Sequence, residues 1–338
     1  MKEIGVEFRK LKDDELGLIP NCFEKENVEL LRHLNWCILY QENSSPHYYM
    51  RNMEPDYYRW GGIIKLGDHP LDFQTSRHHK DIAQLDTPTT DYKKISEDPL
   101  CYEMRSDFPM TEFKYMNGKA FWKEGEILDV EIEFFPYAII IHPDSPQRIC
   151  YWAQPVLVKG MYEGKSIRTL GCIDRFFAPK DKELQKKALE DVLKHYIWSY
   201  YFAVRKDGKK ELAYFNICEH NGKGVAIYWL EGQEPIISDE VTLEAEWHRL
   251  PYAPESDSSV TFTKAIWKFC GKEVHFEGKW GAKGHTATPR MNTIGLTHCY
   301  GSWYEGKSPR EYELMHAANE CSGATIETIE KMGFVMNQ

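Results

Sequence analysis

Residues 198–232 read WSYYFAVRKDGKKELAYFNICEHNGKGVAIYWLEG and indicate the fold class of the chain. Three runs rich in aromatic and apolar residues are separated by Asp207-Gly208 and Asn221-Gly222. Both dipeptides favour the two-residue turns that join antiparallel strands, because these residues tolerate positive φ. The stretch therefore predicts a three-stranded antiparallel meander.

The same pattern extends to both sides of this meander. The segment TEFKYMNGKAFW (111–122) predicts a hairpin around an Asn-Gly turn, and ILDVEIEF (127–134) alternates apolar with mostly acidic residues, as a half-buried strand does. In contrast, residues 67–110 are rich in His, Asp, Pro and Thr and predict a long irregular excursion. Further strands are predicted at 36–41, 60–66, 137–142, 149–159, 165–173, 241–247, 260–269, 273–280, 293–299 and 311–317.

One segment has helical periodicity. PKDKELQKKALEDVLKHY (179–196) has a proline near its start, and Leu184, Ala188, Val192 and Tyr196 follow at helical spacing with charged residues elsewhere. We predict a helix over 179–196.

A short motif occurs twice. Residues 162–168 read YEGKSIR and residues 304–310 read YEGKSPR, which places Tyr162 and Tyr304 142 residues apart (304 − 162 = 142). That spacing is too long for a solenoid repeat and suits a duplicated domain. Coincidence is the alternative, because Y-x-G-K is a natural turn between two strands.

Length and pattern together predict the architecture. A chain of 338 residues suits two domains of ordinary size. Many short strands joined by tight turns are typical of closed barrels, and a barrel of about eight strands encloses one small ligand. We expect a mostly β protein with two antiparallel β-barrel domains, residues 1–178 and 179–338, with the helix 179–196 as the joint.

Charge and composition exclude several classes of partner. The net charge is −10, from 42 basic and 52 acidic residues, whereas a nucleic-acid phosphate backbone requires a positive surface. No polybasic block and no apolar run of membrane-spanning length occurs. The first 17 residues are charged throughout and lack the apolar region of a secretory signal. We expect a cytoplasmic protein that binds neither nucleic acid nor membrane.

The cysteines and the missing motifs predict that no cofactor or metal is used. Nine cysteines are widely spaced without a CxxC pair, which is typical of reduced, buried thiols rather than a zinc or redox site. The chain also lacks the glycine-rich phosphate loops, the GxSxG elbow and the HExxH motif.

Two segments carry a resemblance to a known family. YWAQPVLVKGMYEGKSIRTLGCIDRFF (151–177) and GSWYEGKSPREYELMHAANECSG (301–323) resemble the hydroxyneurosporene synthase-like calycins. These tandem-lipocalin proteins include carotenoid 1,2-hydratases, kievitone hydratase-like enzymes and fungal Diels–Alderases. The chain departs from their pattern at Arg175, where a histidine usually follows the aspartate. The resemblance implies two lipocalin-like barrels and a cofactor-independent hydration, elimination, isomerisation or cyclisation of a hydrophobic small molecule.

Asp174 is the first candidate for catalysis. It follows an apolar strand, and a carboxylate at the mouth of a barrel could act as a general acid or base or orient a neighbouring group. The alternative is a strand-end aspartate paired with Arg168 or Arg175.

His316 and Glu320 are the second candidates, within the segment HAANE. As an acid–base pair they would share a pocket. On a helix, positions i and i+4 face the same way and could bind a metal with further ligands from His142, His220 or His298, which would indicate a metal-dependent hydrolase. On a strand leading to a turn, the two side chains never meet.

Aromatic residues on predicted strands supply the candidates for ligand binding. A flat apolar ligand could stack against a wall of such rings, although a packed core explains them equally well. Without catalysis, the same wall would make the protein a carrier of a lipophilic molecule. The candidates are Trp152, Trp198, Tyr200, Phe202 and Tyr228.

Overall fold

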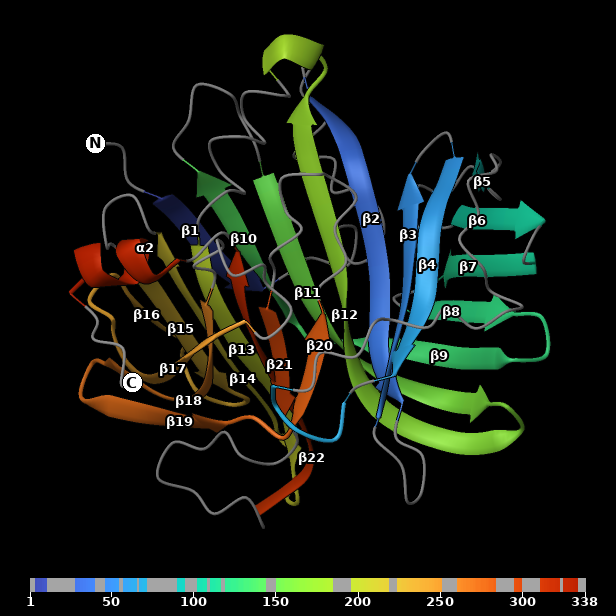
Figure 1. Cartoon of the computed structure of the whole chain (residues 1–338). Helices are drawn as coiled ribbons and strands as arrows, with labels where there is room; N and C mark the ends of the chain where they lie inside the picture. Colours follow the sequence, from blue (N-terminus) through green and yellow to red (C-terminus); the bar gives the residue numbers. More distant parts are fainter. Residues whose placement is uncertain are drawn as a thin grey trace. The chain divides into compact units, whose positions relative to one another are not determined.

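A computed structural model of the chain describes most of the predicted strands (Figure 1). The described residues are 4–10, 28–39, 46–54, 57–65, 67–71, 90–94, 102–107, 110–116, 119–143, 150–184, 196–218, 224–250, 260–283, 295–299, 311–322 and 325–333. The protein is mostly β, as predicted, and its sheets are built from antiparallel strand pairs.

The chain divides into two compact units. Unit 1 comprises Met1–Tyr40, His47–Ile63 and Arg77–Glu190, and unit 2 comprises Gln41–Pro46, Ile64–Ser76 and Asp191–Gln338. Two short segments from the first half of the sequence therefore belong to unit 2, whereas the boundary expected at residue 178 would place both in the N-terminal domain. One of them is tied to that unit by a backbone hydrogen bond of 2.9 Å from Gly67 N to Gly281 O.

Unit 1 is built on one large sheet of twelve strands. Ten of them follow one path: β4 (Tyr57–Lys65), β3 (His47–Glu54), β2 (Val28–Leu39), β12 (Lys165–Pro179), β11 (Cys150–Tyr162), β9 (Leu128–Phe134), β8 (Lys119–Glu124), β7 (Met110–Met116), β6 (Tyr102–Asp107) and β5 (Thr90–Lys94). The remaining two strands are β10 (Tyr137–Pro143), which pairs with β11, and β1 (Ile4–Lys10), which pairs with β10.

The sheet of unit 1 branches at β11. One edge of this strand pairs with β9 from Val156 onward and with β10 up to Ala153. Pro155 lies at the branch, where it has no N–H to donate, and its carbonyl accepts the backbone N–H of Phe135 at 2.9 Å. The opposite edge pairs with β12 along the whole strand, so β11 and β12 form the centre of unit 1.

The turn between β11 and β12 contains the first YEGKS motif. Glu163 and Gly164 have φ values of 47° and 75°, which define the type of two-residue turn that suits the twist of a hairpin. The hairpin predicted at this motif is confirmed. The second motif, at 304–308, lies outside the described residues, so the duplication stays a prediction.

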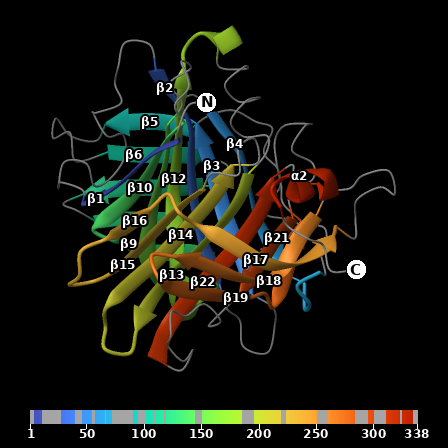
Figure 2. The ribbon, with the colours of Figure 1, turned by 90° about the vertical axis from the view of Figure 1, so that its left-hand side faces the viewer.

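Unit 2 contains two sheets (Figure 2). The larger has the order β16 (Ile236–Ser238), β15 (Gly224–Leu230), β14 (Lys210–Cys218), β13 (Tyr196–Arg205), β22 (Tyr312–Ser322), β21 (Gly295–Cys299) and β20 (Trp280–Lys283). The smaller contains β17 (Thr242–Arg249), β18 (Val260–Phe269) and β19 (Lys272–Glu277). The predicted meander of three strands is confirmed as β13, β14 and β15.

A hydrophobic core joins the two sheets of unit 2. The rings of Phe215 on β14 and Trp267 on β18 stack 4.9 Å apart, and Phe269 meets Phe215 edge-on. The helix α2 (Ile326–Lys331) adds Ile329 to this core. Its N-terminus is capped by Thr325, whose side chain accepts a hydrogen bond from the backbone N–H of Thr328.

Two sequence predictions are corrected. The excursion predicted at 67–110 contains β5, β6 and the start of β7, which are too polar in sequence for their alternation to stand out.

The predicted helix 179–196 is also too long, because Pro179 ends β12 and Tyr196 begins β13. Within it, residues 182–184 are helical and follow Asp181, whose carboxylate caps the backbone N–H of Leu184 at 2.9 Å. Residues 185–195 lie outside the described part.

The alternation predicted for 127–134 is confirmed. Leu128, Val130, Ile132 and Phe134 are buried on one face of β9, among the core residues of unit 1. No helix among the described residues is long and apolar enough to cross a membrane.

Two glycines of the β11–β12 hairpin provide a test of the close packing between β9 and β11. Both have positive φ, but a Cβ at Gly164 would meet nothing within 4 Å, whereas one at Gly160 would lie 2.2 Å from the backbone oxygen of Asp129. Gly164→Ala should lower the free energy of unfolding by about 1–2 kcal/mol through backbone strain. Gly160→Ala should cost roughly 1–3 kcal/mol more through overpacking. Urea unfolding of both variants measures the difference, and equal losses would contradict the register between β9 and β11.

Candidate functional site

The register between β13 and β22 brings five of the predicted site residues onto one face of unit 2. Trp198 lies opposite Glu320, and Phe202 lies opposite His316, with Tyr200 between the two pairs. Directly opposed residues of antiparallel strands project to the same side of the sheet. We call these five residues the β13–β22 face.

Aromatic rings cover this face in a continuous row. The rings of Tyr200 and Phe202 are stacked with their centroids 4.6 Å apart, and the tilted ring of Trp198 is 4.6 Å from Tyr200. The ring of Tyr214, on β14, is 5.9 Å from that of Trp198 and is also tilted. A close row of this kind holds its rings in fixed orientations, because each ring restricts the rotation of the next.

A tyrosine–histidine pair lies within the row. The hydroxyl of Tyr200 and Nε2 of His316 are hydrogen-bonded at 3.1 Å, and each residue is only 1% exposed. Since the effective dielectric constant is low in such a site, this hydrogen bond is stronger than its equivalent in water. The pair therefore places a phenol hydroxyl and an imidazole nitrogen at hydrogen-bonding distance beside aromatic rings.

The row becomes more accessible at the Trp198 end. Trp198 and Glu320 are half-buried, in contrast to Tyr200, Phe202 and His316. The indole Nε1 of Trp198 is itself buried and has no hydrogen-bond partner among the described residues. A buried N–H donor without an acceptor is costly, and an acceptor group on a bound molecule would remove that cost.

His316 and Glu320 do not form a common metal site. Both lie on the strand β22, where four residues span roughly 13 Å, so the helical arrangement considered from the sequence is wrong. Across the described residues, no group of three or more His, Cys, Asp or Glu could hold a metal ion. Of the other proposed ligands, His298 is on β21, His142 is on β10 of unit 1, and His220 lies outside the described part.

Asp174 belongs to unit 1, whereas the residues of the β13–β22 face belong to unit 2. It is on β12 and 9% exposed, and its two carboxylate oxygens accept hydrogen bonds from Trp36 Nε1 at 2.9 Å and from Cys172 Sγ at 3.1 Å. Burial raises the pKa of the Cys172 thiol, and the neighbouring negative charge of Asp174 raises it further. The adjacent Arg175 projects to the opposite face of β12, as alternation along a strand requires.

Trp152 and Tyr228 also lie apart from the aromatic row. Trp152 is fully buried on β11, with the guanidinium of Arg9 5.6 Å from its ring centre. Tyr228 is on β15 and opposes Ala213, so it projects to the face opposite Tyr200. The predicted stacking wall is therefore assembled from three of its five members.

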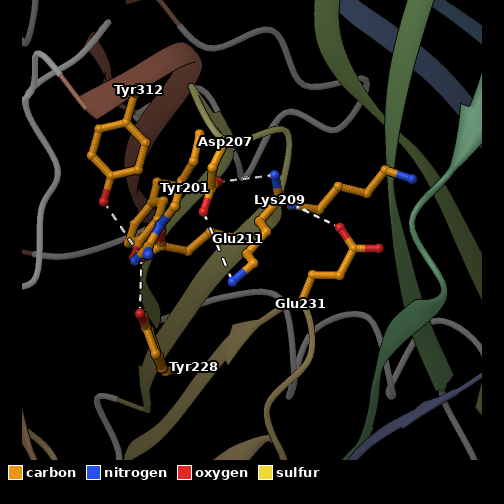
Figure 3. A network of polar contacts seen from close by, with 9 residues as sticks. Tyr201, Asp207, Lys209, Glu211, Tyr228, Glu231 and Tyr312 are labelled. Carbon is orange, nitrogen blue, oxygen red and sulfur yellow. Dashed lines mark hydrogen bonds and ion pairs between the residues drawn. The ribbon is translucent and has the colours of Figure 1, made fainter.

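A buried carboxylate that sequence reasoning missed lies on that opposite face (Figure 3). Glu211 is 0% exposed, and its Oε1 accepts hydrogen bonds from the hydroxyls of Tyr201 at 2.8 Å, Tyr228 at 2.9 Å and Tyr312 at 3.4 Å. Its Oε2 accepts a hydrogen bond from Nε of Arg205. Its signal in the sequence was an acidic residue in phase with Ala213 on a strand that is otherwise apolar.

The electrostatic interactions between Glu211 and its partners indicate a structural role for this network. Burial and the charge of Glu211 raise the pKa of Tyr201 and of Tyr312. Burial lowers the pKa of Arg205, but the hydrogen bond and charge of Glu211 outweigh this effect and raise it overall. Because four donors engage its one carboxylate, we interpret Glu211 as a fixed structural anchor.

Comparisons with known proteins do not assign the chain to a family. No family model and no curated protein matches it. A candidate AttH protein of Nitrosomonas europaea is 12% identical over 94% of this chain and 98% of its own, with a TM-score of 0.45. Kievitone hydratase of Nectria haematococca is 9% identical over 87% and 89%, with a TM-score of 0.41. CghA is 9% identical over 94% and 98%, with a TM-score of 0.37. At these values the matches indicate no activity, and the function must be judged from the site residues.

The Glu211 network allows a test of its structural role. Glu211→Gln removes the charge that Arg205 faces, and breaking a buried ion pair should lower the free energy of unfolding by about 3–5 kcal/mol. Tyr312→Phe removes one long hydrogen bond and should cost about 0.5–1.5 kcal/mol. Asp207→Asn, in the exposed β13–β14 turn, is the control and should change little. If Glu211→Gln proved as mild as this control, Glu211 would not be an anchor.

Proposed function

We propose that the protein is a cofactor-independent enzyme of the lyase or isomerase type that acts on a hydrophobic small molecule at the β13–β22 face. The observation that carries this proposal is the buried hydrogen bond between Tyr200 and His316, set among stacked rings. Hydration, elimination, isomerisation and cyclisation need only one or two positioned acid–base groups and a dry environment, which supports this class of reaction.

Each residue of the face has a part in the proposed mechanism. The hydroxyl of Tyr200 exchanges a proton with the substrate, and Nε2 of His316 exchanges the matching proton with Tyr200. A proton removed from one atom of the substrate can thus return to another atom, or a water can be added or lost, with no net change in the enzyme. Trp198 provides a flat apolar surface and an N–H donor that would orient an acceptor oxygen of the substrate.

The two carboxylates predicted as catalytic groups are given lesser roles. Asp174 has both oxygens engaged by Trp36 and Cys172, so we propose that it holds unit 1 together locally and does not transfer protons. Glu320 lies beside Trp198 at the half-buried end of the row. There we propose that it interacts with polar groups of the substrate.

The second candidate function is a carrier of a lipophilic molecule. The buried indole N–H of Trp198 has no partner within the described part of the chain and favours this function, because binding alone needs a stacking surface and one donor. In a carrier, the Tyr200–His316 hydrogen bond would only orient the Tyr200 ring.

The test uses Tyr200→Phe and His316→Gln with Tyr228→Phe as a matched control. The control removes a tyrosine hydroxyl from the same sheet but from its opposite face. Wild-type protein is incubated with fractionated lipophilic extracts, and mass spectrometry follows new species that are isomers of a consumed compound or differ from it by one water. We expect both site variants to slow this conversion by roughly 10²–10⁴-fold, the usual contribution of general acid–base catalysis. The control should keep its rate.

Binding separates the two candidate functions. If the site variants still bind the consumed compound within a few-fold of wild type but no longer convert it, the enzyme proposal stands. If native mass spectrometry finds a bound lipophilic compound that the wild type never converts, and Trp198→Ala releases it, the carrier replaces the enzyme.

A further inference from the structure

The interior face of the β11–β12 pair in unit 1 changes character along its length. Val156 and Ile173 belong to the apolar core of this unit. The same face continues toward the start of β11 with Trp152, Gln154 and Arg175, which are all 0% exposed. Polar and charged residues are rarely buried this completely unless they are paired or hydrogen-bonded. We call Trp152, Gln154 and Arg175 the Arg175 site.

The orientation of the Gln154 amide is set by its neighbour. Nη1 of Arg175 donates a hydrogen bond to Oε1 of Gln154 at 3.4 Å. A guanidinium has donors and no acceptor, so the amide must turn its oxygen toward Arg175 and its nitrogen away. That nitrogen, Nε2, is buried and has no hydrogen-bond partner among the described residues. The site therefore presents an N–H donor directly beside a buried cation.

The surroundings add positive charge and apolar surface. Arg175 stays protonated at any physiological pH. A second guanidinium, that of Arg9, lies 5.6 Å from the Trp152 ring centre and forms an ion pair with Glu7 at 3.5 Å. Trp152 opposes Arg175 across the strand pair, and Gln154 opposes the apolar core residue Ile173. A cation, an amide donor and an apolar neighbourhood complement an anionic head group on an apolar body.

We propose that the Arg175 site binds the carboxylate of a lipophilic organic acid. One carboxylate oxygen would accept from Nε2 of Gln154 and the other from the guanidinium of Arg175, while the hydrocarbon follows Val156 and Ile173. This binding site belongs to unit 1 and does not depend on Tyr200 or His316, which are in unit 2.

The test compares two fluorescent probes with the same hydrocarbon chain, cis-parinaric acid, whose head group is charged, and its uncharged methyl ester. A charge-assisted pair of hydrogen bonds should make the acid bind wild-type protein at least about tenfold more tightly than the ester. Gln154→Glu is nearly isosteric and places an internal carboxylate beside Arg175. We expect this variant to remain folded, to lose the preference for the acid and to keep its affinity for the ester within about threefold.

Two further variants complete the design. Arg168→Gln removes an exposed arginine from the same strand and should leave both affinities unchanged, so a general effect of positive charge is controlled. Gln154→Leu removes the amide donor without adding a charge and should reduce the preference for the acid severalfold. Circular dichroism checks that each variant is folded.

Several outcomes would overturn the proposal. These are equal affinities of wild type for acid and ester, no saturable binding of either probe, or a preference for the acid that survives in folded Gln154→Glu. A loss of preference in Arg168→Gln equal to that in Gln154→Glu would point to surface charge and would overturn it as well.

Discussion

Strand register is the constraint on which both units depend, because their central strands bury both faces. On β13, Ile197 and Tyr201 enter the core that joins the two sheets of unit 2, while Tyr200 and Phe202 lie on the opposite face and are buried as well. A slip of one residue would exchange these two sets of side chains. The positive φ values of the Glu163-Gly164 turn hold the register in the β11–β12 hairpin of unit 1.

With register established, the buried polar groups divide into two kinds. The first kind is saturated: Glu211 accepts from three tyrosines and an arginine, and Glu124 accepts from Tyr49 at 2.6 Å and from Trp122 at 2.9 Å. Such carboxylates bind strands together and offer little to a ligand. The second kind keeps an open donor, as in Trp198 and Gln154. The carrier alternative and the Arg175 site rest on the second kind, because an open buried donor is stabilised by a bound acceptor. The enzyme proposal rests on the hydrogen bond between Tyr200 and His316.

Sequence reasoning was most reliable where a pattern is local. The hairpin around Asn117-Gly118 is confirmed by the pairing of Met116 with Lys119, and the alternation in 127–134 is confirmed by burial. Both follow from neighbours along the chain. The helix 179–196 was overextended because helical spacing was counted into two flanking strands, and Leu184, assigned to its apolar face, is 47% exposed.

The candidate site could be predicted only in part, because it depends on which strands become neighbours. The aromatic alternation of Trp198, Tyr200 and Phe202 was visible, and so was His316, but nothing in the sequence placed β22 beside β13. The same gap explains Glu211, whose three tyrosine partners come from β13, β15 and β22. Long-range pairing creates these contacts, and a single sequence carries no direct signal for it.

The most direct test of the central claim is nitrogen NMR of protein labelled at its histidine side chains. If Tyr200 and His316 share a buried hydrogen bond, the Nε2 resonance of His316, assigned by its loss in His316→Gln, should move in Tyr200→Phe and stay in place in Tyr228→Phe. Addition of a lipophilic compound that the protein converts should move it again. An Nε2 resonance of His316 that is the same in wild type and in Tyr200→Phe would contradict the proposed acid–base pair.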